Sequence, residues 1–229
     1  MPAAAGEFPC FNAIVLAGGR SSRLDGTPKA LLQVSGRTLL GVALDAAAAA
    51  SAVAVAGPQS LSAAVGTARA DALLVREDPP FSGPAAAVAV AWAALAADAA
   101  DNGRTPPDWT LVLACDMPFV SAAVGALLTA AAAADARVSA PPAARSQSLV
   151  AVDESGRTQP LAALYRTAEL GAAVQRHDRP GGLENLSMKR LLARVQWRDV
   201  AVPAHSTADV DTWEDARRWS VEAGRPAQT

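Results

Sequence analysis

Short apolar runs alternate with longer alanine- and leucine-rich stretches along the first 140 residues of the chain. The short runs have the length of buried strands, and the longer stretches have the length and periodicity of helices. Strands are predicted at residues 12–16, 52–56, 72–75, 110–114 and 137–140. Helices are predicted at residues 38–50, 84–100 and 121–134. The alternation predicts an α/β fold with three layers, in which helices cover both faces of a mostly parallel, Rossmann-like sheet.

The ends of two predicted helices carry local signals. Thr38 is a side chain suited to cap a helix N-terminus. Pro84 suits the first turn of a helix, where its missing N–H costs nothing.

The pattern changes after Pro141. Two apolar runs, residues 148–152 and 161–165, flank the turn signal Asp-Glu-Ser-Gly at residues 153–156, which predicts a hairpin appended to the sheet. A short helix after Thr167, a helix at about 186–193, a strand at 195–200 and a closing helix at 212–223 complete the prediction. Residues 225–229 are expected to fray. No linker-like stretch separates two cores, so residues 1–229 are predicted to form a single domain.

Composition narrows the possible classes of protein. The chain has 20 basic and 22 acidic residues, a balance that lacks the electrostatic footprint of a binder of long nucleic acids. The two cysteines, Cys10 and Cys115, form neither a disulfide framework nor a C-x-x-C metal motif. Neither a signal peptide nor an apolar run of membrane length is evident. We therefore expect a cytoplasmic protein without nucleic-acid or membrane partners, present as a monomer or a small homo-oligomer.

The first candidate site is the loop Leu-Ala-Gly-Gly at residues 16–19, directly after the first strand. Paired glycines let the backbone bend sharply and approach a ligand, and backbone amides in such a turn form a concave anion site. Arg20, Arg23 and Lys29 add three cations within ten residues. The loop lacks the G-x-x-x-x-G-K-[ST] motif of a P-loop. The pattern favours a nucleoside triphosphate site; the alternative is a surface loop with solvated basic residues.

The second candidate is Asp116, in the sequence Cys-Asp-Met-Pro that follows the strand at 110–114. Ligands of open α/β sheets bind outside the carboxyl ends of the strands. Mg²⁺ takes oxygen ligands, often one or two carboxylates together with phosphate oxygens. Asp116 is therefore a candidate Mg²⁺ ligand. The alternative is that Asp116 caps the helix that begins near Val120.

The third candidate is the acidic segment near the C-terminus. Asp209 and Asp211 alternate, so they point the same way if the backbone there is extended. They are candidates for a second carboxylate facing the metal. The alternative is that Asp211 or Thr212 caps a helix whose first turn carries further acidic residues.

Taken in order, these segments resemble the nucleotidyltransferase family that includes the molybdenum cofactor guanylyltransferases. The resemblance covers most of the chain. It rests on the 16–19 loop with Arg23 and Lys29, on Asp78 with Ser82-Gly83-Pro84, on Cys115-Asp116-Met117-Pro118, on Gln159-Pro160-Leu161 with Leu164-Tyr165, and on residues 209–214.

The resemblance implies a fold like that of nucleotide-diphospho-sugar transferases and a Mg²⁺-dependent transfer of GMP from GTP to molybdopterin, with release of pyrophosphate. It implies nucleotide binding by Leu16, Ala17, Gly18, Gly19, Lys29, Asp78 and Asp116. Catalysis would fall to Arg23, Lys29 and Asp116, and Mg²⁺ to Asp116 and Asp211. The acceptor would meet Gln159, and Lys189 and Arg190 on a predicted helix are further candidates, with a solvated helix face as the alternative. Residues of about 10–140 would form the nucleotide-binding half, and residues of about 141–224 the acceptor-side half.

Four features depart from the guanylyl branch of that family. Asp25 stands where the family has glycine, and it would be unfavourable near phosphates unless it turns outward. Pro28 before the lysine, and aspartates at 209 and 211, are similar to the cytidylyl branch. Gly57 stands roughly where guanylyl enzymes have asparagine. Three alternatives therefore stay open: a cytidylyltransferase acting on molybdopterin or a small phosphorylated alcohol, a non-catalytic nucleotide-binding protein, and a sugar-phosphate nucleotidyltransferase.

Overall fold

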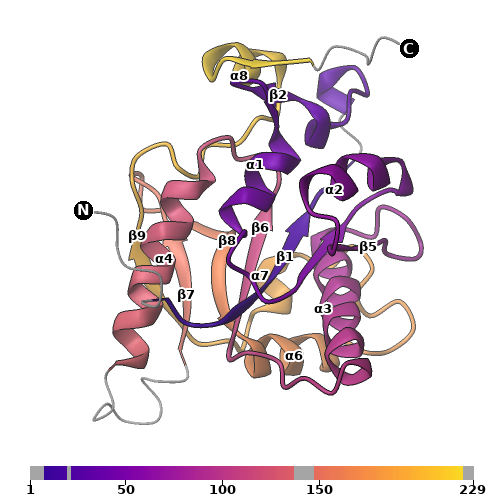
Figure 1. Ribbon diagram of the computed structural model, residues 1–229, viewed down its shortest axis with the longest axis vertical. Coiled ribbons are helices and arrows are strands. Elements are labelled where there is room, and N and C mark those ends of the chain that lie inside the picture. Colours follow the sequence, from indigo (N-terminus) through magenta and orange to yellow (C-terminus); the bar gives the residue numbers. More distant parts are fainter. Residues whose placement is uncertain (1–7, 20–21, 137–146, 224–229) are drawn as a thin grey trace.

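The main sheet has seven strands in the order β5-β4-β1-β6-β8-β7-β9 (Figure 1). The structure is a computed structural model that describes residues 8–19, 22–136 and 147–223. Among the described strands of this sheet, β8 alone runs against the others. The strands are β1 (Phe11–Leu16), β4 (Val53–Ala56), β5 (Leu73–Val75), β6 (Trp109–Ala114), β7 (Ser148–Val152), β8 (Thr158–Arg166) and β9 (Trp197–Ala201).

Helices cover both faces of the sheet, so the three-layer prediction is confirmed. One face carries α1 (Leu39–Ala46), α2 (Ser62–Ala68) and α4 (Val120–Asp135). The other carries α3 (Pro84–Asp101), α6 (Thr167–Gln175) and α7 (Met188–Leu191). Strand β1 supplies both cores, because Ala13 and Val15 point to the first face and Ile14 and Leu16 to the second. A strand buried on both faces is mostly apolar, which is why the apolar run at residues 12–16 predicted this strand.

A second, smaller sheet joins residues 33–38, which follow β1, to residues 221–222 near the C-terminus. Its strands, in the order β10-β2-β3, are β2 (Gln33–Val34), β3 (Arg37–Thr38) and β10 (Val221–Glu222). Helix α8 (Trp213–Arg218) lies beside it, and Figure 1 shows α8 and β2 together at the top of the molecule. A third core cluster lies here: Leu24, Leu32 and Leu39 from the N-terminal half pack with Val210, Ala216 and Val221 from the C-terminal half. Residues 209–222 are thereby fixed against the segment that follows β1.

Most predicted elements are present, with shifts at their ends. Thr38 does cap α1, since its hydroxyl accepts a hydrogen bond from the Gly41 N–H at 3.0 Å. The closing helix predicted at 212–223 is too long, because α8 ends at Arg218 and the chain turns to pair β10 with β2. The predicted helices 38–50 and 186–193 are likewise shorter, as α1 and α7. The predicted strand 137–140 and the C-terminal residues 225–229 lie outside the described residues.

Within the described part of the chain, α3 has the length and composition of a membrane span, although no such span was predicted. Its surroundings explain the composition in another way. Ala85, Val88, Ala91 and Leu95 are buried. They belong to the second core cluster, and α3 lies against β1, β4 and β5. The apolar face of α3 is therefore a core face of the sheet.

Candidate functional site

Three loops meet where β1, β4 and β6 end. Leu16 is in register with both Ala56 and Ala114, the last residues of the neighbouring strands. The Ala17 N–H donates to the Ala56 carbonyl at 2.8 Å, and the Cys115 N–H donates to the Leu16 carbonyl at 3.0 Å. The glycine loop, the Gly57 turn and the loop of Asp116 therefore lie side by side at the carboxyl edge of the sheet, where open α/β sheets bind ligands.

Two adjoining pockets open at this edge. The first, here named the loop pocket, is lined by Ala17, Gly57, Pro58 and Leu61. The second, named the strand-edge pocket, is lined by Gly83, Pro84, Asp116 and Leu161. Both pockets also share five lining residues: Gly18, Gly19, Lys29, Glu77 and Phe81. The glycines and the lysine singled out in the sequence thus stand between the two pockets.

Small residues let the loops pack closely. Gly19 has a φ of 141°, a conformation that side chains rarely adopt. A Cβ on Gly57 would lie 3.1 Å from Leu61 Cδ1 and 3.4 Å from the carbonyl carbon of Ala17. Gly57 therefore keeps the β4 loop against the glycine loop, and the asparagine of the guanylyl branch would require Leu61 to shift.

Lys29 joins two of the predicted carboxylates. Its Nζ lies 3.1 Å from Asp116 Oδ2 and also donates to Asp211 Oδ1. Burial of the ammonium lowers its pKa, but the charge of Asp116 and the hydrogen bonds to both carboxylates raise it by more, so the pKa of Lys29 lies above its ordinary value. Lys29 is therefore a permanent cation at neutral pH. Helix α4 has Phe119 as its N-cap and no side-chain capping bond, so the alternative in which Asp116 caps that helix is wrong.

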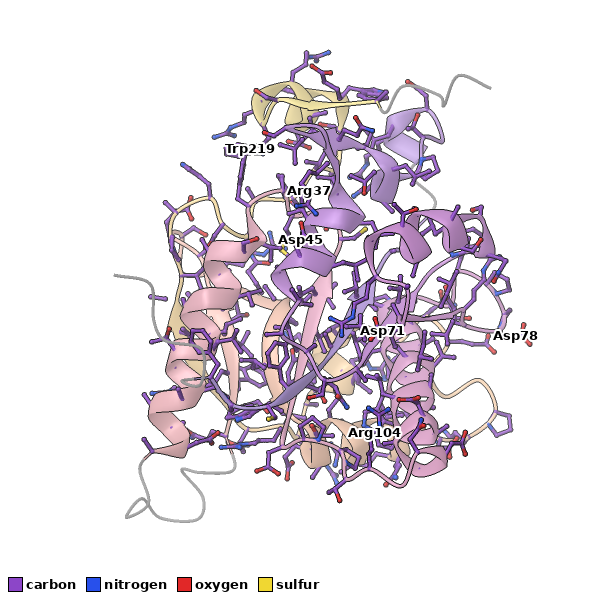
Figure 2. All side chains as sticks on the ribbon, viewed as in Figure 1. Arg37, Asp45, Asp71, Asp78, Arg104 and Trp219 are labelled. Atoms are coloured by element: carbon purple, nitrogen blue, oxygen red, sulfur yellow. The ribbon has the colours of Figure 1, made fainter. Side chains whose placement is uncertain are left out.

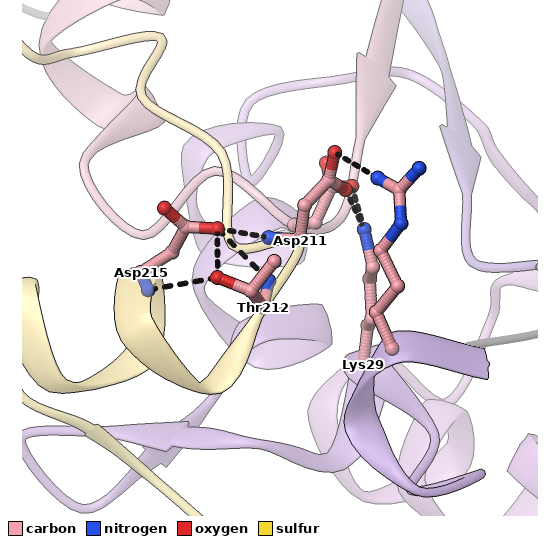
Figure 3. A network of polar contacts seen from close by, with 6 residues as sticks. Lys29, Asp211, Thr212 and Asp215 are labelled. Carbon is pink, nitrogen blue, oxygen red and sulfur yellow. Dashed lines mark hydrogen bonds and ion pairs between the residues drawn. The ribbon is translucent and has the colours of Figure 1, made fainter.

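The C-terminal segment brings Asp211 to this place. Val210 is fully buried in the third core cluster, and its N–H donates to the Asp116 carbonyl at 3.0 Å. Thr212 caps α8 in a capping box with Asp215, whose carboxylate also accepts from the Asp211 N–H at 3.1 Å (Figure 3). The two roles foreseen for the acidic segment are thus divided between residues: Thr212 caps the helix, and Asp211 faces Lys29.

Two further predicted residues, Arg23 and Asp209, carry charges that interact with Asp211. Arg23 is exposed, with Nη1 4.0 Å from Asp211 Oδ2. Asp209 has a raised pKa because of desolvation and the neighbouring charges of Asp211 and Asp116. Arg20 lies outside the described residues.

The segment after β5 differs most from expectation. Asp78 is exposed at the outer edge of the molecule and lines another hollow, beside α3 and α6 (Figure 2). Its neighbour Glu77 lines that hollow too, and it also lines both pockets, together with Phe81. The sequence alone did not indicate which of the two acidic residues reaches the pockets.

The three residues predicted to bind the acceptor lie on two different elements, β8 and α7. Gln159 lies in β8, and its side-chain amide donates to Asp153 Oδ2 at 2.9 Å. Leu161, two residues further on, lines the strand-edge pocket. Lys189 and Arg190 are exposed on α7.

Asp116 and Asp211 are the carboxylates predicted to hold Mg²⁺. In the described ranges, no group of three or more His, Cys, Asp or Glu residues is close enough to hold a metal by itself. Asp116 and Asp211 nevertheless both reach the same atom, Lys29 Nζ. Mg²⁺ is commonly held by one or two carboxylates with phosphate oxygens and water completing its shell. The two carboxylates are compatible with a Mg²⁺ ion that arrives with a phosphorylated ligand.

A glycine loop, a lysine and paired carboxylates at the carboxyl edge of an open α/β sheet form an arrangement that suits phosphorylated ligands. The profile of MobA-like NTP transferase domains matches residues 13–201, and the chain belongs to this family. It is a nucleotidyltransferase.

Known proteins support the family assignment. The chain is 33% identical over 218 residues to a molybdenum cofactor guanylyltransferase of Acidiphilium cryptum (strain JF-5), covering 90% of this chain and 95% of that one. The crystal structure of Rv0371c from Mycobacterium tuberculosis H37Rv is 26% identical, with a TM-score of 0.58 over 92% of this chain and 97% of that chain. The 2-C-methyl-D-erythritol 4-phosphate cytidylyltransferase of Francisella tularensis shares the fold at 13% identity, with a TM-score of 0.65 over 92% and 98% of the two chains.

Proposed function

We propose that this enzyme transfers GMP from GTP to a phosphorylated acceptor, molybdopterin, and releases pyrophosphate. The observation that carries the proposal is the Lys29–Asp116–Asp211 cluster beside the glycine loop, whose lysine lines both pockets. The 33% identity to a molybdenum cofactor guanylyltransferase supports the choice of GTP and molybdopterin. The enzyme would work in the cytoplasm as a monomer or small homo-oligomer.

In the proposed reaction, an oxygen of the acceptor phosphate attacks the α-phosphorus in line. The new O–P bond forms as the bond to the β-phosphate oxygen breaks, and pyrophosphate leaves. The attacking phosphate is already ionised, so no general base is required. Catalysis then rests on positioning and on neutralising charge.

The residues of the chain divide this work. Lys29, which stays protonated because its pKa is raised, donates to phosphate oxygens, and Arg23 adds a second cation from the exposed side. Backbone amides of the glycine loop bind the phosphates. Asp116 and Asp211 would hold Mg²⁺, which supplies further charge neutralisation when bound. The start of β8 with Gln159, and the exposed Lys189 and Arg190, would face the acceptor.

A cytidylyltransferase activity is the second candidate function. Pro28, Asp209 and Asp211 are similar to the cytidylyl branch, and the tight packing at Gly57 leaves little space for the asparagine of the guanylyl branch. The acceptor in this reading is molybdopterin or a small phosphorylated alcohol.

A thermal-shift panel with GTP, CTP, ATP and UTP, each with and without Mg²⁺, tests the proposal. A ligand that binds only the native state raises the apparent stability. We expect GTP with Mg²⁺ to raise Tm most, and pyrophosphate to be released when molybdopterin is added. A larger shift with CTP would select the cytidylyl reading, and no shift with any of the four would overturn nucleotide binding.

A further inference from the structure

Phe81 occupies an unusual position for a large apolar residue. Its side chain is 44% exposed, and it lines both the loop pocket and the strand-edge pocket. Its φ is 67°, in the left-handed region that bulky residues avoid. Neither the exposure nor the backbone conformation is explained by packing of the core.

Neighbouring side chains hold Phe81 in this conformation. The Glu77 carboxylate accepts a hydrogen bond from the Phe81 N–H at 3.0 Å, and the Arg76 guanidinium lies 5.4 Å from the centre of the ring. The next residue, Ser82, is buried and accepts through its carbonyl from the Asn185 N–H at 2.7 Å. A strained residue persists only where its surroundings fix it, and such residues concentrate at ligand sites.

One part of the loop pocket suits a flat, apolar group, because Ala17, Pro58 and Leu61 line it. The charged residues Lys29, Arg76 and Glu77 line the rest, together with Pro28, Phe81 and glycines. If Lys29 binds phosphates, the base of the same nucleotide can lie against Pro58 and Leu61 in the loop pocket, which Phe81 also lines. An aromatic side chain that is exposed at such a place offers a face on which a base can stack.

Glu77 adds a preference among bases. An ionised carboxylate only accepts hydrogen bonds, and it would repel the triphosphate, so it is compatible with a nucleotide where donors face it, either the ribose hydroxyls or N–H groups of the base. The position of Glu77 beside Phe81 favours the base. Guanine presents two adjacent donors, N1–H and N2–H₂, on one edge. Cytosine and adenine present one amino donor beside an acceptor nitrogen, and uracil presents one N–H between two carbonyls.

We propose that Phe81 stacks on the base of the donor nucleotide and that Glu77, which positions Phe81, also accepts hydrogen bonds from the N–H edge of guanine. This inference rests on the proposed function, because it assigns the base-binding part of the same site. It adds two residues that the sequence motifs did not indicate, and it gives a physical reason for a preference for GTP over CTP.

Binding of GTP and of tripolyphosphate, which has no base, is measured by calorimetry for the wild type, Phe81→Leu, Phe81→Tyr and Phe8→Leu. Phe8 is a matched control, since it is 45% exposed but precedes β1 at the opposite edge of the sheet. We expect Phe81→Leu to weaken GTP binding about tenfold and to leave tripolyphosphate binding unchanged. Phe81→Tyr, which keeps the aromatic face, and Phe8→Leu should bind GTP like the wild type.

Equal GTP affinity of the wild type and Phe81→Leu would overturn the stacking role. An equal loss of GTP and tripolyphosphate would also overturn it, because it would indicate a disturbed loop. A wild type that binds tripolyphosphate as tightly as GTP would refute the inference while leaving the phosphate site intact. A wild type that binds neither would refute the proposed function itself.

Glu77→Gln tests recognition of the base by Glu77 separately from stacking by Phe81. Glutamine keeps an oxygen for the Phe81 N–H but presents an amide N–H₂ in place of the second carboxylate oxygen. We expect the ratio of GTP to CTP affinity to fall about tenfold, while Phe81→Leu weakens both nucleotides similarly. An unchanged ratio in Glu77→Gln would remove Glu77 from base recognition.

Discussion

The indole N–H of Trp213 donates a hydrogen bond to Asp25 Oδ2 at 2.8 Å, between residues 188 positions apart in the sequence. Asp25 has a φ of 52°, which glycine adopts freely and which aspartate tolerates better than most residues. The bond directs the carboxylate towards the start of α8. Asp25 therefore serves as an attachment point for the C-terminal segment that carries Asp211.

Removing this bond should loosen that attachment. Trp213→Phe keeps most of the ring but deletes the N–H, and we expect the free energy of unfolding to fall by about 1 kcal/mol. In a double-mutant cycle with Asp25→Ala, the two losses should not add, because each variant removes the same interaction. Urea denaturation measures all four free energies. Additive losses would show that the bond contributes nothing in solution.

Replacing Lys29 should abolish most of the activity without unfolding the protein. The ammonium is the one described cation in contact with both Asp116 and Asp211, and it is placed to stabilise the charge that develops on phosphate oxygens. We expect Lys29→Ala to reduce kcat by roughly 10²- to 10³-fold, as for the loss of a preorganised donor. Pyrophosphate release measures turnover, and circular dichroism checks the fold.

Arg104→Ala is the control for Lys29→Ala. Arg104 lies beyond the end of α3, away from the glycine loop, and pairs with Asp98 of that helix (Figure 2). This variant also loses a cation and an ion pair, and it should turn over like the wild type. Near-wild-type turnover by Lys29→Ala would contradict the assignment of Lys29.

Divalent metal should become limiting when a carboxylate is removed. If Asp116 and Asp211 hold Mg²⁺, then Asp116→Asn and Asp211→Asn each remove one negative ligand, and the Mg²⁺ concentration for half-maximal turnover should rise about tenfold or more. Chelation with EDTA should stop turnover in the wild type, and Mg²⁺ should restore it. An unchanged Mg²⁺ requirement in both variants would place the metal elsewhere.

The sequence predicted those parts of the fold that depend on local patterns. Strands β1, β4 and β6 are buried on both faces, so their apolar runs and the loops behind them were recognisable. For the same reason the positions of the glycine loop and Asp116 at one edge followed directly, since parallel strands end at the same edge. Thr38 as a helix cap is a local signal of the same kind.

The parts that were missed depend on contacts between distant segments. Strands β2, β3 and β10 have two residues each, too few to show any periodicity, and they form only because the third core cluster brings the two halves together. Because the chain turns there to pair β10 with β2, α8 ends at Arg218, before the end predicted for the closing helix. That Glu77 and not Asp78 lines the two pockets depends on the path of the segment after β5, which composition does not encode.

The two cysteines should differ sharply in reactivity. Cys115 is buried, and burial together with the charge of Asp116 raises the pKa of its thiol well above the ordinary value, whereas Cys10 is exposed. Because the thiolate is the reactive form, a thiol reagent should modify one cysteine in the native protein and two in urea. Cys10→Ser should leave the native protein unmodified. Rapid modification of Cys115 in that variant would show that a reagent reaches its thiol through the strand-edge pocket, which Cys115 lines.

Acid should weaken the hairpin between β7 and β8 through a single carboxylate. Asp153 accepts hydrogen bonds from the backbone of Ser155 and Arg157 and from the side chains of Ser155 and Gln159, and these bonds lower its pKa from 3.8 to about 2. A lowered pKa contributes stability that is complete above 3.8 and is lost as the pH falls towards about 2. The free-energy difference between the wild type and Asp153→Asn should therefore be constant near neutral pH and shrink below about pH 4. Urea denaturation from about pH 6 to about pH 3 measures this difference, with Asp101→Asn at the exposed end of α3 as the background. A difference that stays constant over this range would show that the turn does not bind the ionised carboxylate in preference to the protonated one.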